Sequence, residues 1–122
     1  MEQKSALTVE PNALLGQLEG SEQKARDMAA RYLCEFVDLR DYHLDAELFK
    51  TVPVDLMFRY NFVPLEQNES TLSIAIADPS KLMMIDEIAL LLNRRLEIRV
   101  STLSQISDTL KRTEQAQRDK NE

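Results

Sequence analysis

The sequence predicts an α+β domain, in which amino-terminal helices precede a small three-stranded sheet packed with helices. Two patterns carry this prediction. In several stretches apolar residues recur every three or four positions, which is typical of amphipathic helices. Near residues 71–77 and 96–100 large apolar residues instead occupy every second position, which is typical of strands. The predicted order of the second half is therefore strand, strand, helix, strand, helix.

The composition is that of one globular domain. The chain has 122 residues, of which 43% are hydrophobic and 30% charged. Its formal net charge of -6 argues against nucleic acid as a partner, because phosphate binding usually needs a basic face. The single Cys34 has no disulfide partner, and the sequence holds no apolar run that could span a membrane. We therefore expect a cytoplasmic protein without direct membrane insertion.

Residues 1–20 are predicted to form a flexible lead-in, because they mix polar residues with short apolar pairs and include Pro11 and both glycines. The domain proper is predicted over residues 21–113. Ser21 is predicted to be the N-cap of its first helix, which runs to Leu33. One side of this helix carries a predicted apolar stripe of Ala25, Met28, Ala29 and Leu33.

Residues 36–39 are predicted to be extended, and two short helices follow them. Asp45 is suited to accept an N–H hydrogen bond at the start of the first helix. Pro53 fits the start of the second, where an N–H group has no partner within the helix. Asn61 tolerates the left-handed conformation that ends many helices, so we expect the second helix to end there.

The predicted strands are residues 62–65, 71–77 and 96–100. The first two are expected to form an antiparallel hairpin across the polar turn at residues 67–70. The large apolar residues of the second strand share one face and are predicted to be buried: Leu72, Ile74 and Ile76. A last helix is predicted to start at Ser101 or Thr102, and residues 114–122 are predicted to be a disordered tail.

The helix between the second and third strands is richer in apolar residues than one buried face requires. It follows the turn Asp78-Pro79-Ser80, and Asn93 ends it. Its predicted core stripe is Leu82, Ile85, Ile88, Ala89 and Leu92. The surplus apolar residues are a candidate partner-binding patch, although methionine also serves as core filler. The candidate partner-binding residues are Met83, Met84, Leu91, and the adjacent Arg94 and Arg95, which a solvated turn would also explain.

The polar residues with potential for chemistry have structural explanations. Asp38, Asp41, His43 and Asp45 could hold a metal ion, but a solvated loop with a helix cap is favoured, because only one histidine is present. Cys34 could be a reactive thiol, and a small core residue is the more common role. No nucleophile–base pair or carboxylate pair is suggested. The sequence therefore predicts no catalytic site, no cofactor and no metal, and we do not expect an enzyme.

Several short motifs occur in an order that resembles a known family. They are Val37-Asp38-Leu39, Pro53, Arg59-Tyr60, Pro64-Leu65 and Ala77-Asp78-Pro79. Over roughly residues 25–112 the chain resembles the amino-terminal domain of the bacterial type II secretion and type IV pilus assembly ATPases, the GspE/PilB-type and MshEN-like domain family. In that family the domain precedes an ATPase core and docks the motor onto an inner-membrane assembly partner.

The resemblance implies a non-catalytic interaction domain. The phosphate-binding loop of an ATPase needs the pattern GxxxxGK[ST], and the only glycines here are Gly16 and Gly20. The implied function is to dock a secretion or pilus-type ATPase, or a related regulator, to its partner. The resemblance implies that this partner is the cytoplasmic domain of an inner-membrane secretion or pilus assembly protein, which could recruit the chain to the inner membrane. An ATPase core, on this or another chain, is a further expected partner.

The alternative function is a regulatory module that senses cyclic di-GMP, because some relatives of this domain bind that nucleotide. Their motif lies in the amino-terminal half. The segment Leu15-Gly16-Gln17-Leu18 is similar to its start. The arginine that precedes it in the motif is absent, and so is the continuation Leu-xxx-Leu-xx-Gln, so the resemblance favours docking over sensing.

Overall fold

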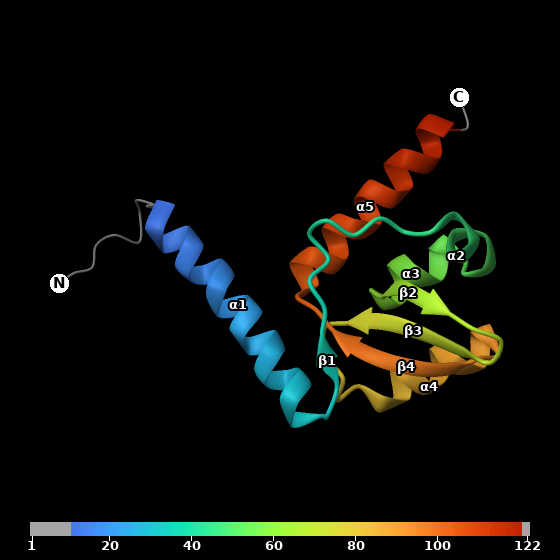
Figure 1. Cartoon of the computed structure of the whole chain (residues 1–122), viewed down its shortest axis with the longest axis horizontal. Coiled ribbons are helices and arrows are strands. Elements are labelled where there is room, and N and C mark those ends of the chain that lie inside the picture. The colour runs from blue at the N-terminus through green and yellow to red at the C-terminus, as the bar shows by residue number, and fades with distance from the viewer. Residues whose placement is uncertain (1–10, 121–122) are drawn as a thin grey trace.

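The structure is a computed structural model that describes residues 11–120, with the backbone alone for residues 11–19 and 120. Five helices pack around one small sheet in the described residues, which confirms the predicted α+β class (Figure 1). The elements are α1 (Pro11–Arg31), β1 (Glu35–Phe36), α2 (Ala46–Thr51), α3 (Val54–Tyr60), β2 (Val63–Gln67), β3 (Thr71–Ile76), α4 (Leu82–Leu92), β4 (Arg95–Val100) and α5 (Leu103–Lys120).

The sheet has four strands in the order β1-β4-β3-β2. The predicted hairpin is present, since β2 and β3 are antiparallel, and β4 lies parallel to β3 after the crossover through α4. The predicted three-stranded sheet gains a fourth strand because Glu35 and Phe36 pair in parallel with Arg99 and Val100. The extended segment predicted at residues 36–39 overlaps this strand, but its pairing with the sheet was not predicted, because two residues are too few to show which strand they join.

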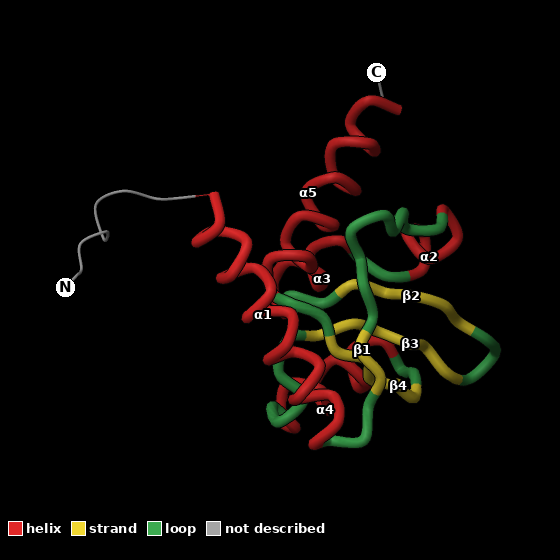
Figure 2. Tube along the Cα trace, turned by 60° about the vertical axis from the view of Figure 1, so that its left-hand side comes forward, coloured by secondary structure: helices red, strands yellow, loops and turns green. Residues whose placement is uncertain are grey.

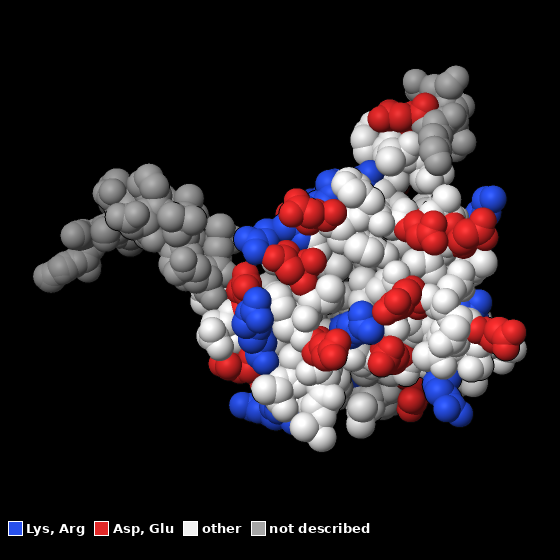
Figure 3. All heavy atoms as spheres, in the orientation of Figure 1, with Lys and Arg blue, Asp and Glu red and all other residues white. Residues whose placement is uncertain are grey.

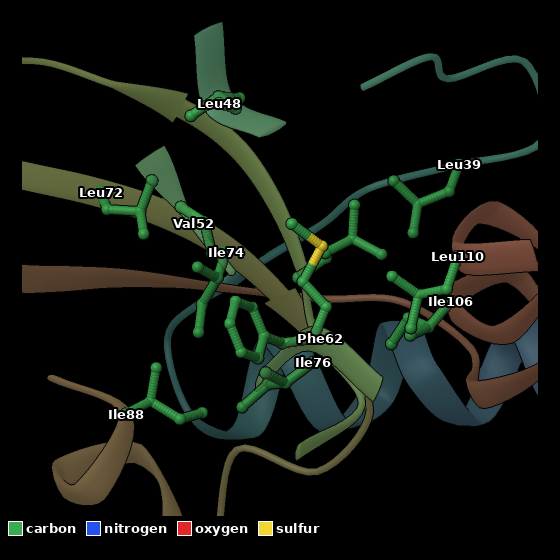
Figure 4. Packing of buried hydrophobic residues seen from close by; sticks show 13 residues of the cluster. Leu39, Leu48, Val52, Phe62, Leu72, Ile74, Ile76, Ile88, Ile106 and Leu110 are labelled. Atoms are coloured by element: carbon green, nitrogen blue, oxygen red, sulfur yellow. The ribbon is translucent and has the colours of Figure 1, made fainter. Parts of the chain in front are cut away.

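The core lies on the face of the sheet that the helices cover. The prediction for β3 is confirmed, because Leu72, Ile74 and Ile76 are all 0% exposed. Figure 4 shows the β3 side chains between Ile88 of α4 and Ile106 of α5. Each such side chain stabilises the fold by roughly 1.5–3 kcal/mol relative to leaving it exposed.

The opposite face of the sheet is polar. Arg99 of β4 lies 3.1 Å from a carboxylate oxygen of Glu66, and 3.7 Å from oxygens of Glu35 and of Glu97. Ser73 of β3 donates a hydrogen bond of 2.8 Å to Glu97. Figure 3 shows basic atoms surrounded by acidic groups on this side of the molecule. Three glutamates therefore surround Arg99, and Arg95 lies on the same face at the start of β4.

The first helix differs from its prediction at both ends. It begins at Pro11 rather than Ser21, and proline fits a first helical position because its missing N–H has no helical partner there. It ends at Arg31, because Leu33 has a φ of 59° and turns the chain out of the helix. Leu33 is 94% exposed, so its predicted place in the apolar stripe is wrong. Cys34 packs beside Ala25 and Ala29 instead.

The last helix continues past Thr113 to Lys120. Two side-chain pairs spaced four residues apart support this extension. Arg118 lies 3.4 Å from Glu114, and Gln115 donates a hydrogen bond of 3.2 Å to Asp119. The division of the chain into a lead-in, a domain over residues 21–113 and a tail stays a prediction.

The predicted helix ends are confirmed at several positions. Asp45 is the N-cap of α2 and accepts a hydrogen bond from the Glu47 N–H. Asn61 and Asn93 take the left-handed conformation and end α3 and α4. Thr102 accepts a hydrogen bond of 3.0 Å from the backbone of Gln105 at the start of α5. Over residues 11–120, no helix combines the length and the hydropathy that crossing a membrane requires.

Candidate functional site

Three exposed apolar residues of α4, Met83, Leu90 and Leu91, lie on the side away from the core, and we call them the apolar ridge. Met83 is 86% exposed, Leu90 82% and Leu91 52%. Met83 and Leu90 are seven residues apart and so lie above one another on the helix. The opposite side of α4 packs into the core through Ile88 and its neighbours. The helix is thus apolar on both sides, and one side has no partner among the described residues.

The sequence located this surface in part. Met83 and Leu91 are exposed, whereas Met84 is half-buried against the core. Leu82, predicted to be core, is 66% exposed because it is the first residue of the helix and lies beyond the main cluster. Leu90 was missed, although its heptad spacing from Met83 is visible in the sequence.

Acidic side chains flank the ridge. Glu87 accepts a hydrogen bond of 2.7 Å from the Tyr60 hydroxyl of α3. This hydrogen bond raises the pKa of Tyr60, because the neutral phenol is the donor. Asp86 is exposed on the same helix. The contact of Glu87 with α3 fixes the orientation of α4 about its own axis.

The two arginines that follow α4 differ in their contacts. Arg94 is half-buried and donates a hydrogen bond of 2.8 Å to Gln67 of β2. Arg95 is exposed and begins β4. Both line a shallow hollow of about 770 Å³, which extends the ridge toward β4. Its main lining residues are Glu69, Asp86, Ala89, Leu90, Arg94 and Arg95.

The polar residues around His43 have separate local roles. Asp38 accepts hydrogen bonds of 3.0 and 3.1 Å from Arg40 Nε, and this interaction lowers the pKa of Asp38 to about 2. Asp45 caps α2. In the described part of the chain, no three His, Cys, Asp or Glu side chains are grouped as a metal site requires.

Cys34 lies at the junction of α1 and β1. Its thiol donates a hydrogen bond of 3.5 Å to the carbonyl of Tyr32. Burial raises its pKa, which favours the unreactive thiol over the nucleophilic thiolate. Nearby, the guanidinium of Arg26 lies 4.3 Å from the ring centre of Phe36. The surroundings of Cys34 are those of a packing residue.

Comparison with known proteins gives the family. The MshEN domain profile matches residues 32–120. The type IV pilus assembly ATPase PilB of Myxococcus xanthus (strain DK1622) is 24% identical over 92 residues. That alignment covers 75% of this chain and 16% of PilB, so the chain spans only a small part of this curated relative.

Solved structures share the fold. A structure of MshE with cdg has a TM-score of 0.67 at 22% identity, covering 75% of this chain and 66% of the other. One crystal form of the N-terminal domain of XpsE has a TM-score of 0.60 at 22% identity, covering 92% and 99%. Another has 0.64 at 24% identity, covering 91% and 78%. The profile match and the shared fold together show that the chain belongs to the MshEN domain family, the N-terminal domains of GspE/PilB/MshE-type secretion and pilus ATPases.

Proposed function

We propose that this chain is a non-catalytic docking domain of the cytoplasm. It links a secretion or pilus-type ATPase, or a related regulator, to the cytoplasmic domain of an inner-membrane assembly protein. The observation that carries the proposal is the apolar ridge of α4, whose side chains are exposed although the other side of the helix already completes the core. Exposed apolar surface with polar surroundings is typical of protein-binding sites.

The shape of the ridge suits a helix or a groove of the partner. Met83 and Leu90 form a row along α4, and Leu91 widens that row at its carboxyl end. Rows of this kind bind complementary apolar surfaces through residues spaced three, four and seven apart. The flexible thioether of Met83 adapts to a partner with little strain.

The remaining candidate residues support the ridge from its margins. Met84 packs against the core below the ridge, so it holds α4 in place. Arg94 and Arg95 lie at the end of the ridge, where they offer positive charge to an acidic rim of the partner. Charges at such a rim act more on the rate of association than on affinity.

The test uses a variant that carries Met83→Gln and Leu90→Gln together. We expect its affinity for the cytoplasmic domain of the inner-membrane assembly protein to fall at least about tenfold, because the apolar contact is lost. Its free energy of unfolding should change by less than about 1 kcal/mol, because both side chains are exposed.

Leu103→Gln is the matched control, because Leu103 is also an exposed leucine, 55% exposed, but lies on α5. This control should keep wild-type affinity, measured by isothermal titration calorimetry. Wild-type affinity in the α4 variant would contradict the proposal.

A cyclic di-GMP sensor is the second candidate function. It is favoured by the fold that this chain shares with MshE, whose solved structure contains cdg. The family match begins at residue 32, and the segment Leu15–Leu18 lies outside it and outside the described side chains. A thermal-shift experiment separates the two functions, since a ligand at 100 times its Kd stabilises by about 2.7 kcal/mol. A shift with cyclic di-GMP but not with GMP would support the sensor.

A further inference from the structure

The outer edge of β2 is closed to other strands. Pro64 has no N–H, and the strand carries a bulge between Pro64 and Glu66. The Tyr42 hydroxyl donates to the carbonyl of Pro64 at 2.7 Å and lies 3.2 Å from that of Leu65. Proline, a bulge and an occupied carbonyl each prevent a further strand from pairing.

The outer edge of β4, on the other side of the sheet, lacks these protections over four of its six residues. β4 pairs with β3 from Arg95 to Val100, but with β1 only at Arg99 and Val100. Figures 1 and 2 place β1 beside one end of β4 only. We call Arg95–Ile98 the open edge, because no strand pairs with its outer side in the described part of the chain.

The direction of the backbone groups of β4 follows from the hydrogen bonds at its two ends. Arg95 and Ser101 donate their N–H groups to carbonyls beside β3, whereas the Val100 carbonyl accepts from Val37 on the β1 side. Successive residues of a strand point their backbone groups to alternate sides. The N–H and C=O of Leu96 and the N–H of Ile98 therefore point outward, beyond the end of β1.

We propose that the open edge binds an extended segment of a partner protein, which adds to the sheet as a strand in line with β1. The unpaired groups of Leu96 and Ile98 form the hydrogen bonds of this added strand. The segment has the pattern apolar–basic–apolar, with its basic residue beside Glu97. The apolar–basic–apolar pattern reads the same in both directions, so the added strand can run parallel or antiparallel to β4.

The charge of the sheet face selects the basic residue. Beside β1, Glu35 pairs with Arg99 as oppositely charged neighbours. Among residues 11–120, no strand residue lies in the corresponding place beside Glu97, because the chain turns away at Leu33. The Glu97 side chain is 60% exposed, and the Arg99 beside it already pairs with Glu66 at 3.1 Å, so Glu97 can accept a further cation. A lysine or arginine beside Glu97 would continue the alternation that Glu35 and Arg99 begin.

The exposed flank of α4 selects the apolar residues. Glu87 on one flank contacts Tyr60 of α3, so Ala89 on the other flank lies toward β4. The hollow lined by both Ala89 and Arg95 agrees with this orientation. An apolar side chain of the added strand beside Leu96 would cover this flank at Ala89, near the start of β4.

The inference goes beyond the proposed function, because strand addition at β4 does not require the apolar ridge. Its test uses two synthetic pentapeptides with blocked ends, TVKVT and TVEVT, titrated into the full chain labelled with 15N. We expect saturable shifts at the amides of Leu96 and Ile98. TVKVT should bind about tenfold more tightly than TVEVT, and Glu97→Lys should reverse this preference.

Several outcomes would overturn the proposal. These are the absence of saturable shifts at Leu96 and Ile98, equal affinity for both peptides, and shifts confined to β2. Shifts of the same amides that depend on protein concentration alone would identify a second copy as the occupant. The variant with Met83→Gln and Leu90→Gln should still bind TVKVT, so failure of the docking function and failure of strand addition give different results.

Discussion

The two edges of the sheet face their surroundings in opposite ways. At β2, Tyr42 occupies the carbonyl of Pro64, and α2 packs against the strand. At β4, two residues of β1 cover the last third of the strand, and the residues before Arg99 keep a free outer side in the described part of the chain. One sheet thus combines an edge that excludes other strands with an edge that can accept one.

The β2 edge is partly covered by Tyr42, and residues of α5, far away in the sequence, hold the loop that carries Tyr42. Tyr42 lies in the loop between β1 and α2, and Arg112 of α5 donates hydrogen bonds of 3.1 Å to the carbonyls of Leu39 and Tyr42. Gln105 accepts a hydrogen bond of 2.8 Å from the Leu39 N–H. The contribution of Tyr42 to the closed β2 edge therefore depends on α5, whereas the open part of β4 is set by the length of β1.

The largest expected effect tests whether the two edges belong to one cooperative unit. Ile74→Ala removes a fully buried side chain from β3, the strand that pairs with both β2 and β4. We expect a loss of roughly 2–5 kcal/mol in the free energy of unfolding, from lost burial and the cavity left behind. Urea denaturation measures this loss, and hydrogen exchange should show that both edges open together.

Leu33→Ala is the control for Ile74→Ala, because Leu33 is 94% exposed. It should change the free energy of unfolding by less than about 0.5 kcal/mol. If amide exchange in Ile74→Ala became faster at only one of the two edges, the edges would unfold separately. The closed and open edges would then belong to two independent regions and not to one cooperative unit.

A smaller effect is expected when the closed edge is opened. Tyr42→Phe removes the hydroxyl that donates to Pro64, and we expect a loss of about 0.5–1.5 kcal/mol. Urea denaturation at neutral pH measures the loss. An unchanged stability would mean that Pro64 and the bulge close this edge without Tyr42.

The same variant has a pH signature. Burial raises the pKa of Tyr42 to about 12, above its usual value near 10. The unfolded chain therefore loses this proton first, so the stabilisation is present below about pH 10 and is lost as the pH rises toward 12. The stability difference between wild type and Tyr42→Phe should shrink over that range, and a constant difference would contradict the assigned burial.

The smallest effect concerns the polar face between the two edges. Arg99→Met removes the guanidinium that lies among Glu35, Glu66 and Glu97. Because these ion pairs are partly exposed, we expect a loss of less than about 1 kcal/mol, which salt should reduce further. Urea denaturation at low and high salt measures it. A loss that is independent of salt would show that Arg99 acts through packing of its stem.

Regular patterns in the sequence were enough to predict much of the fold. The alternation in β3 identified Leu72, Ile74 and Ile76 as core, and Asn61 and Asn93 were identified as helix ends. These signals are local, because each depends on a few neighbouring residues.

Features that depend on distant contacts were not predictable in this way. The strand β1 exists because Glu35 and Phe36 meet β4, and the short segment alone gives no sign of that pairing. The exposure of Leu33 follows from its positive φ, which leucine rarely adopts. On α4, Met83 and Leu91 were placed on the surface correctly, but their binding role stays a prediction.

The pairing of β1 with β4 also has a consequence for the order of folding. Strands β2 and β3 meet across a short turn, whereas β1 and β4 are separated in the sequence by three helices and two strands. Contacts between distant segments form slowly, because closing the long intervening loop costs entropy. We expect β1 to join last. Until it does, the whole outer side of β4 is exposed, and the newly made chain is then most prone to aggregate through that strand.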